Sequence, residues 1–235
     1  MGTTNKTSIA ISNKHPSSSV KGWRGMLVPF ILFILSLFIW QSPVIRPIKY
    51  LTVFFHELSH GMAAIMTGGE IVRIELSANT GGLCVSRGGN RFLIVSAGYL
   101  GSLIWGCLIL AVASKTDFDK EATAALGILL LIVTALWVRN LAGIIICILT
   151  GIGLIAIAKY FSTNFCDQFL KYFGLTSCFY VILDMKDHLV YRTIEGSDAY
   201  VMGQMLGISD RIVGGVWLVI ATVITWKVLS YCLNE

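Results

Sequence analysis

Long apolar stretches make up most of the chain, and short polar segments separate them. A helix needs about 20 apolar residues to cross the hydrocarbon core of a bilayer. The longest stretch is too long for one crossing and is interrupted only by Arg139 and Asn140, so we expect two helices that turn there. We therefore predict an all-α polytopic membrane protein with about six to seven transmembrane helices. The predicted spans are residues 26–44, 48–66, 92–113, the two halves of 122–158, 172–189 and 212–231.

A segment with a different period follows the second apolar stretch. After two consecutive glycines, Val72, Ile74 and Leu76 occupy every second position, so these three side chains are expected to face one way. An Asn-Thr-Gly-Gly sequence at 79–82 is typical of a turn, and residues 83–85 fit a returning strand. We predict a small β-hairpin here. Its open edge could receive an extended peptide by strand addition, or the hairpin could be a simple connector.

Composition supports a membrane protein and excludes other classes. Hydrophobic residues are 55% of the 235 residues and charged residues only 13%, whereas soluble domains have about 25% charged residues. The net charge of +5 includes no dense basic stripe, so no nucleic-acid partner is expected. Residues 1–24 are polar and predicted to be a disordered tail, followed by a single membrane-embedded domain at 25–235. A cytoplasmic N-terminus is predicted, because it places most Lys and Arg on the cytoplasmic side.

His56, Glu57 and His60 form a His-Glu-x-x-His pattern inside the second apolar stretch. Residues four apart share one face of a helix, so both imidazoles can reach one metal ion. Glu57 lies beside them, placed to act as a general base. Two imidazoles and a carboxylate are costly inside a membrane unless they have a partner. The pattern therefore predicts a catalytic zinc site with Zn²⁺ as the cofactor.

A zinc ion with two histidine ligands needs a third protein ligand. Asp184 follows an apolar run, and an intramembrane aspartate suggests a function. Asp187 and His188 come three and four residues later, on the same face if the segment is helical. We predict Asp184 as the third ligand, with Asp187 and His188 as possible alternative ligands or supporting groups.

These features resemble the site-2 protease family of intramembrane zinc metalloproteases, and most closely its compact branch without a PDZ domain. The resemblance covers about residues 52–198. It rests on Phe-His-Glu-Leu-Ser-His-Gly at 55–61, Thr-Gly-Gly at 67–69, Ala-Gly-Tyr-Leu-Gly-Ser at 97–102, Asp184-Met185-Lys186-Asp187 and Ser197-Asp198-Ala199.

The resemblance implies that His56, His60 and Asp184 bind zinc and that Glu57 is the catalytic base. Well-studied members carry their aspartate as Leu-Asp-Gly, whereas Met185 follows it here. The implied activity is hydrolysis of peptide bonds in membrane-protein substrates, presented as a transmembrane helix or an extended peptide within the lipid bilayer. One alternative is a catalytically inactive binding or regulatory membrane protein that retains a metal site. Another is a metal or proton transporter, which the absence of an internal repeat disfavours.

Overall fold

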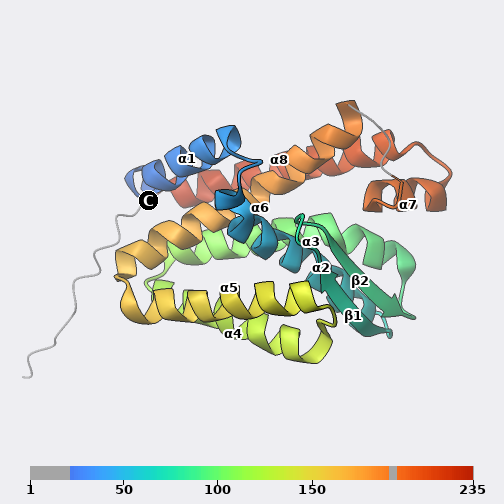
Figure 1. Ribbon diagram of the computed structural model, residues 1–235. Helices are drawn as coiled ribbons and strands as arrows, with labels where there is room; N and C mark the ends of the chain where they lie inside the picture. The colour runs from blue at the N-terminus through green and yellow to red at the C-terminus, as the bar shows by residue number, and fades with distance from the viewer. Residues whose placement is uncertain (1–21, 191–194, 235) are drawn as a thin grey trace, which may run out of the picture.

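The computed structural model describes the backbone of residues 22–190 and 195–234, and the side chains of these residues except 184–190. Helices account for most of the described chain (Figure 1). In chain order the elements are α1 (Gly22–Phe38), a 3₁₀ turn (Pro43–Ile45), α2 (Arg46–Met66), β1 (Glu70–Leu76), β2 (Gly82–Arg87), α3 (Arg91–Lys115), α4 (Asp119–Trp137), α5 (Leu141–Tyr160), α6 (Thr163–Val190), α7 (Asp198–Leu206) and α8 (Asp210–Leu233).

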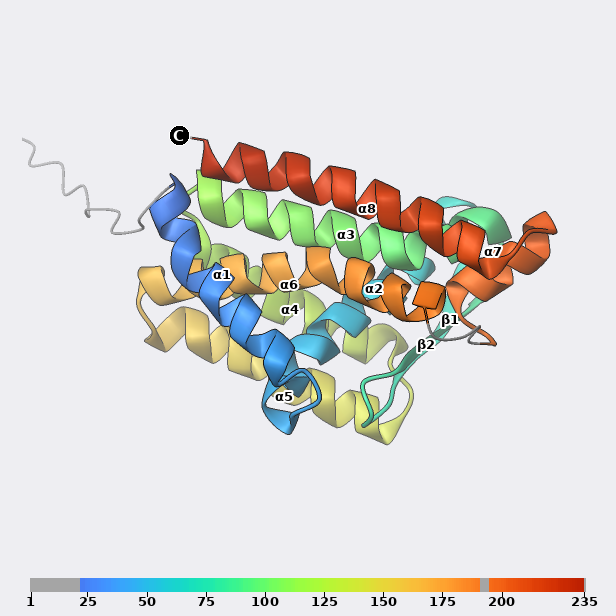
Figure 2. The same ribbon diagram turned by 90° about the horizontal axis from the view of Figure 1, so that it is seen from above.

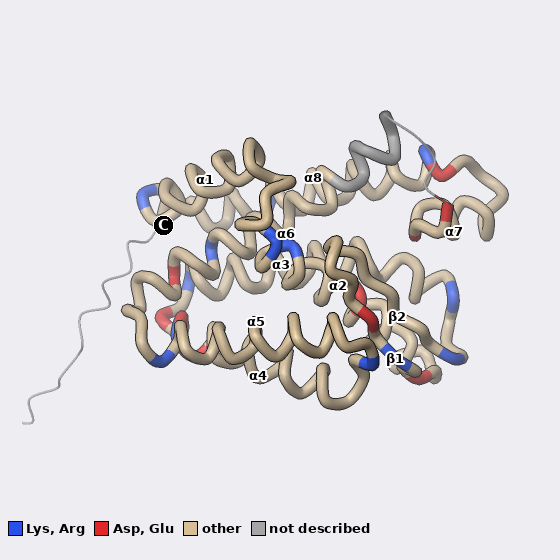
Figure 3. The backbone as a smooth tube through the Cα atoms, in the orientation of Figure 1, with Lys and Arg blue, Asp and Glu red and all other residues tan. Residues whose placement is uncertain are grey.

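Four of the described helices, α3, α4, α5 and α8, are long and apolar enough to cross a membrane. Figure 3 shows that charged residues gather near helix ends and on the hairpin, while α4 and α5 carry none along most of their length. The protein thus has the character of an integral membrane protein. The predicted count of six to seven spans is not confirmed. Two of the predicted spans, α1 and α2, are not among these four helices. Helix α1 has only 17 residues, and α2 carries the two histidines and Glu57, which lower its mean hydropathy.

The helices form a bundle in which α3 packs against α2, α6 and α8. From above, α3 and α8 run side by side, and α4 and α5 lie on the other side of α6 (Figure 2). The predicted turn at residues 139–140 is present, since α4 ends at Trp137 and α5 begins at Leu141. Close backbone contact joins α3 to α6: a Cβ at Gly106 or at Gly174 would lie within 3.0 Å of the other helix. This contact fixes α6, the element that precedes α7 in the chain.

Helix α2 is held by a core on the face away from its histidines. Phe54 and Phe55 are fully buried and join a cluster that includes residues of β1, α4, α5 and α6. In a membrane-embedded bundle, close packing of such rings between helices stabilises the fold through van der Waals contact. With its apolar face packed in this way, α2 directs His56 and His60 to a fixed place beside α3.

The predicted β-hairpin is present as an antiparallel pair of strands. The expectation that Val72, Ile74 and Leu76 face one way was wrong for Val72. The register shifts between Ile71 and Arg73, and an extra residue in one strand exchanges the faces on either side of it. Ile71, Ile74 and Leu76 are therefore buried, while Val72 is 38% exposed.

The hairpin lies along α2 and is attached at its tip and at one edge. At the tip, the Tyr50 hydroxyl donates a hydrogen bond to the Ala78 carbonyl at 2.7 Å. Along the outer edge of β1, the connection between α4 and α5 forms a bridge through Val138 to Ile74. The outer edge of β2 pairs with no strand in the described part of the chain. The hairpin and α7 lie at the same end of the molecule in both views (Figures 1 and 2).

Candidate metal centre

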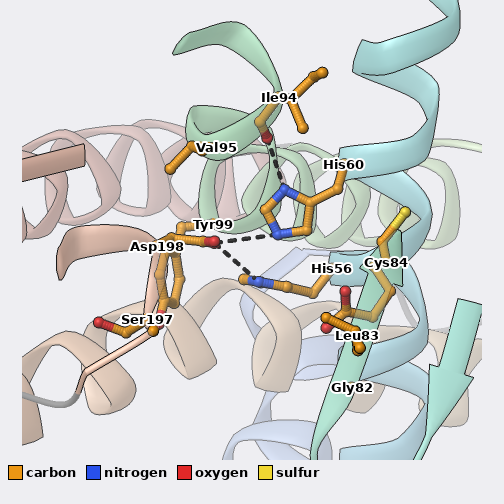
Figure 4. Close-up of a pocket in the computed structure, with 12 residues that line it drawn as sticks. His56, His60, Gly82, Leu83, Cys84, Ile94, Val95, Tyr99, Ser197 and Asp198 are labelled. Atoms are coloured by element: carbon orange, nitrogen blue, oxygen red, sulfur yellow. Dashed lines mark hydrogen bonds and ion pairs between the residues drawn. The ribbon is translucent and has the colours of Figure 1, made fainter. Parts of the chain in front are cut away.

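Two histidines of α2 and one aspartate of α7 meet at this end of the molecule. The Nε2 atoms of His56 and His60 lie 3.1 Å and 3.2 Å from the same oxygen, Oδ2 of Asp198 (Figure 4). One ligand atom from each residue lies within 4.8 Å of the others, and no other described group of His, Cys, Asp and Glu gathers three such atoms. The i, i+4 spacing on α2 brings the imidazoles together, and the fold adds the carboxylate.

Asp198 is positioned by the start of α7. Ser197 precedes it as the N-cap residue, and its hydroxyl accepts a hydrogen bond from the Tyr200 backbone N–H at 3.2 Å. Ala199 and Met202 are buried in a cluster with Tyr99 of α3 and Trp217 of α8. This packing attaches the short helix to α3 and α8 and directs the Asp198 carboxylate toward α2.

The orientation of His60 leaves one ring nitrogen free for a metal. Its Nδ1 lies 2.6 Å from the Ile94 carbonyl oxygen. A carbonyl can only accept a hydrogen bond, so Nδ1 carries the proton and Nε2 of the neutral ring keeps its lone pair. A hydrogen bond of this kind typically orients a metal-ligating histidine. His56 is held differently: its ring makes an edge contact with Tyr99, with centroids 4.8 Å apart.

Gly98 of α3 provides the space in which the three ligand atoms meet. A Cβ at this position would lie within 3.0 Å of Nε2 of His60, Nε2 of His56 and Oδ2 of Asp198. Real Cβ atoms essentially never approach other atoms so closely. Only glycine therefore allows α3 to pass the centre at this distance.

The donor set fits a metal cation. In neutral His60 the Nε2 lone pair faces a carboxylate oxygen, so two acceptors point at each other, and a cation between them resolves the conflict. Oδ2 of Asp198 is buried, and the two imidazole nitrogens lie within 3.2 Å of it. Ligand atoms of a tetrahedral zinc site lie about 3.4 Å apart, from bond lengths near 2.1 Å. The observed separations of 3.1 Å and 3.2 Å are close to this value.

Glu57 and the hairpin complete the site. The Glu57 side chain is buried, and Gly82 of β2 lies directly against it: a Cβ at Gly82 would come within 3.0 Å of its carboxyl group. A cavity of about 270 Å³ is lined by the two histidines, Glu57, Asp198, the start of β2 and residues of α3 that include Tyr99. The start of β2 therefore forms one wall of the space that holds the candidate ligands and base (Figure 4).

The Peptidase M50B-like family model matches residues 30–228, which is most of the chain. The chain belongs to the site-2 protease family. No curated protein and no solved structure matches the sequence significantly. Membership of the site-2 protease family implies a metallopeptidase, and the cluster of His56, His60 and Asp198 is compatible with that assignment.

In this site-2 protease family member, the predicted residues His56, Glu57 and His60 lie together at the cavity. The side chains of Asp184, Asp187 and His188 lie outside those that the structure describes, so the prediction of Asp184 as third ligand is not tested. The described carboxylate at the centre is Asp198, to which no role was assigned from the sequence. Two signals pointed to it: the Ser-Asp start of a helix after Gly196, and the Ser197-Asp198-Ala199 stretch that resembles the family.

Proposed function

We propose that this protein is an intramembrane zinc metalloprotease, in which His56, His60 and Asp198 hold the metal and Glu57 is the general base. The observation that carries the proposal is the convergence of two imidazole nitrogens and a carboxylate oxygen at Gly98, beside a buried glutamate. Two nitrogen ligands and one carboxylate oxygen form a set used by catalytic zinc, which keeps its fourth position open. Membership of a metallopeptidase family supports this assignment.

A bound zinc ion would lower the pKa of a water molecule and polarise the carbonyl of the bond to be cut. Glu57 would accept a proton from the attacking water and then deliver it to the leaving amine. Ile94 would keep His60 in the tautomer that offers Nε2, through the 2.6 Å hydrogen bond. The negative charge of the Asp198 carboxylate would make the site bind a divalent cation more tightly than the two histidines alone.

The free edge of β2 would bind the substrate in an extended conformation. The outer edge of β1 is already occupied by the connection between α4 and α5, whereas that of β2 has no paired strand in the described chain. Residues 82–84 of β2 line the same cavity as Glu57. A peptide that adds to this edge gains backbone hydrogen bonds and is carried past the base. The substrate class that fits is therefore a membrane-protein segment that can unfold locally.

Removal of the metal should abolish cleavage reversibly. The purified protein in detergent is incubated with fluorescein-labelled casein, a largely unfolded probe, and with 1,10-phenanthroline. We expect release of labelled fragments to fall to background with the chelator and to recover when zinc is added in excess. Cleavage that persists after the metal has been removed would rule out the proposal. Bound zinc with no cleavage of casein or of reconstituted single-pass membrane peptides would favour the inactive binding protein.

A further inference from the structure

We propose that Asn140, in the connection between α4 and α5, is a positioning residue of the active site. It would hold β1, and through β1 the start of β2, in place against Glu57. This inference rests on the proposed protease function. Asn140 is not among the candidate metal ligands or the residues that line the cavity.

Asn140 pairs with the backbone of β1 as another strand would. Its Nδ2 donates a hydrogen bond to the Leu76 carbonyl at 2.8 Å, and its Oδ1 accepts one from the Leu76 N–H at 3.1 Å. The side-chain amide thus satisfies both backbone groups of a residue that lies 64 positions earlier in the chain. Leu76 is the last residue of β1, so this pairing fixes the end of the strand nearest the turn.

The neighbours of Asn140 extend this pairing. The Arg139 N–H donates to the Ile74 carbonyl at 3.2 Å, and Val138 forms a parallel bridge with Ile74. Gly143, one turn into α5, leaves room for the amide, since a Cβ there would lie within 3.0 Å of Oδ1 of Asn140. The connection is therefore joined to the outer edge of β1 by one bridge and by hydrogen bonds to Ile74 and Leu76.

The side chain of Asn140 does not have the role that its position in the sequence would suggest. Asn140 is the N-cap residue of α5, where asparagine is favoured because its side chain accepts a hydrogen bond from the first turn. Here the side chain makes no such bond to the helix. Both ends of the amide are used for Leu76 instead, which distinguishes a contact with the hairpin from ordinary helix capping.

A short series of contacts leads from Asn140 to the candidate base. Leu76 pairs with Gly82 across the hairpin, and Gly82 lies directly against the carboxyl group of Glu57. Loss of the amide would free the end of β1 and allow Gly82 to move away from Glu57. The edge of β2 would then no longer present a bound peptide at the correct distance from the base.

The test compares Asn140→Asp and Asn140→Leu with the wild type and with a control, Asn164→Asp, at an exposed position of α6. Aspartate keeps the shape and the acceptor but removes the donor, and leucine removes both. Each protein is purified in detergent and measured for zinc content, for hydrogen exchange of residues 70–87, and for KM and kcat with fluorescein-labelled casein.

We expect the backbone amides of residues 70–87 to exchange faster in both Asn140 variants than in the wild type. Amide exchange in α3 and α8 should not change, and neither should the zinc content. KM should rise roughly tenfold in Asn140→Leu and less in Asn140→Asp, because two hydrogen bonds are lost in the first and one in the second, while kcat changes less than KM.

Unchanged exchange of the hairpin would overturn the inference, as would faster exchange with unchanged KM and kcat. Loss of zinc and faster exchange throughout the molecule would show a purely structural role and overturn it too. A wild type that neither binds zinc nor cleaves casein would contradict the proposed function instead, and the exchange data would still decide whether Asn140 anchors the hairpin.

Discussion

Replacing Glu57 with glutamine should lower the rate of casein cleavage by about a thousandfold, since general acid–base catalysis typically contributes 10²–10⁴-fold. The amide has almost the same shape as the carboxyl group but cannot accept the proton of the attacking water. Zinc content should stay at the wild-type value, because Glu57 is not among the residues whose ligand atoms gather at the centre. The rate is measured at saturating casein, and zinc by elemental analysis of the same samples.

Glu121→Gln is the matched control for this substitution, because it makes the same chemical change at an exposed position of α4. Its rate should equal that of the wild type. If Glu57→Gln keeps more than a tenth of the wild-type rate, Glu57 is not the base. If it loses its zinc, the residue supports the metal rather than the proton transfer.

Replacing Gly98 with alanine should prevent metal binding, although the change adds only one methyl group. The new Cβ would occupy the place where the ligand atoms of His56, His60 and Asp198 converge. To avoid the overlap, α3 would have to move from α2, or the ligands would have to separate. We expect bound zinc to fall below about a tenth of the wild-type amount, and cleavage to fall with it.

Gly153→Ala provides the control for Gly98→Ala, because a Cβ at Gly153 of α5 would meet no atom within 4 Å. Alanine in a helix interior is favoured over glycine by about 1 kcal/mol, so this variant should be at least as stable as the wild type and fully active. Normal zinc content in Gly98→Ala would show that the centre is not as close to α3 as the structure places it.

Local patterns in the sequence were enough to predict much of the fold and part of the site. The spacing of His56 and His60 places them on one helix face whatever the rest of the chain does. The turn at Arg139 and Asn140 followed from the length of the apolar stretch. The hairpin followed from the alternation of apolar and polar residues and from its Gly-rich turn. Which side chains of β1 are buried could not be predicted in full. The register shift near Val72 depends on how the strands pair, and no local pattern reports it.

Features that depend on distant residues could not be predicted in this way. Asp198 reaches the histidines because α7 packs on α3 and α8, and it lies at a helix start rather than inside an apolar run. Nothing in the sequence near Asn140 indicates that its amide bonds to Leu76, 64 residues earlier. Gly98 is similar, since its requirement for glycine arises from side chains of two other helices.

The zinc content of purified Asp198→Ala, beside Asp184→Ala and the wild type, tests the central claim most directly. The account predicts about one zinc per chain in the wild type and in Asp184→Ala, and loss of zinc in Asp198→Ala with the helical fold retained by circular dichroism. Zinc retained in Asp198→Ala and lost in Asp184→Ala would contradict it, and would make Asp184 the third ligand, as the sequence alone predicted.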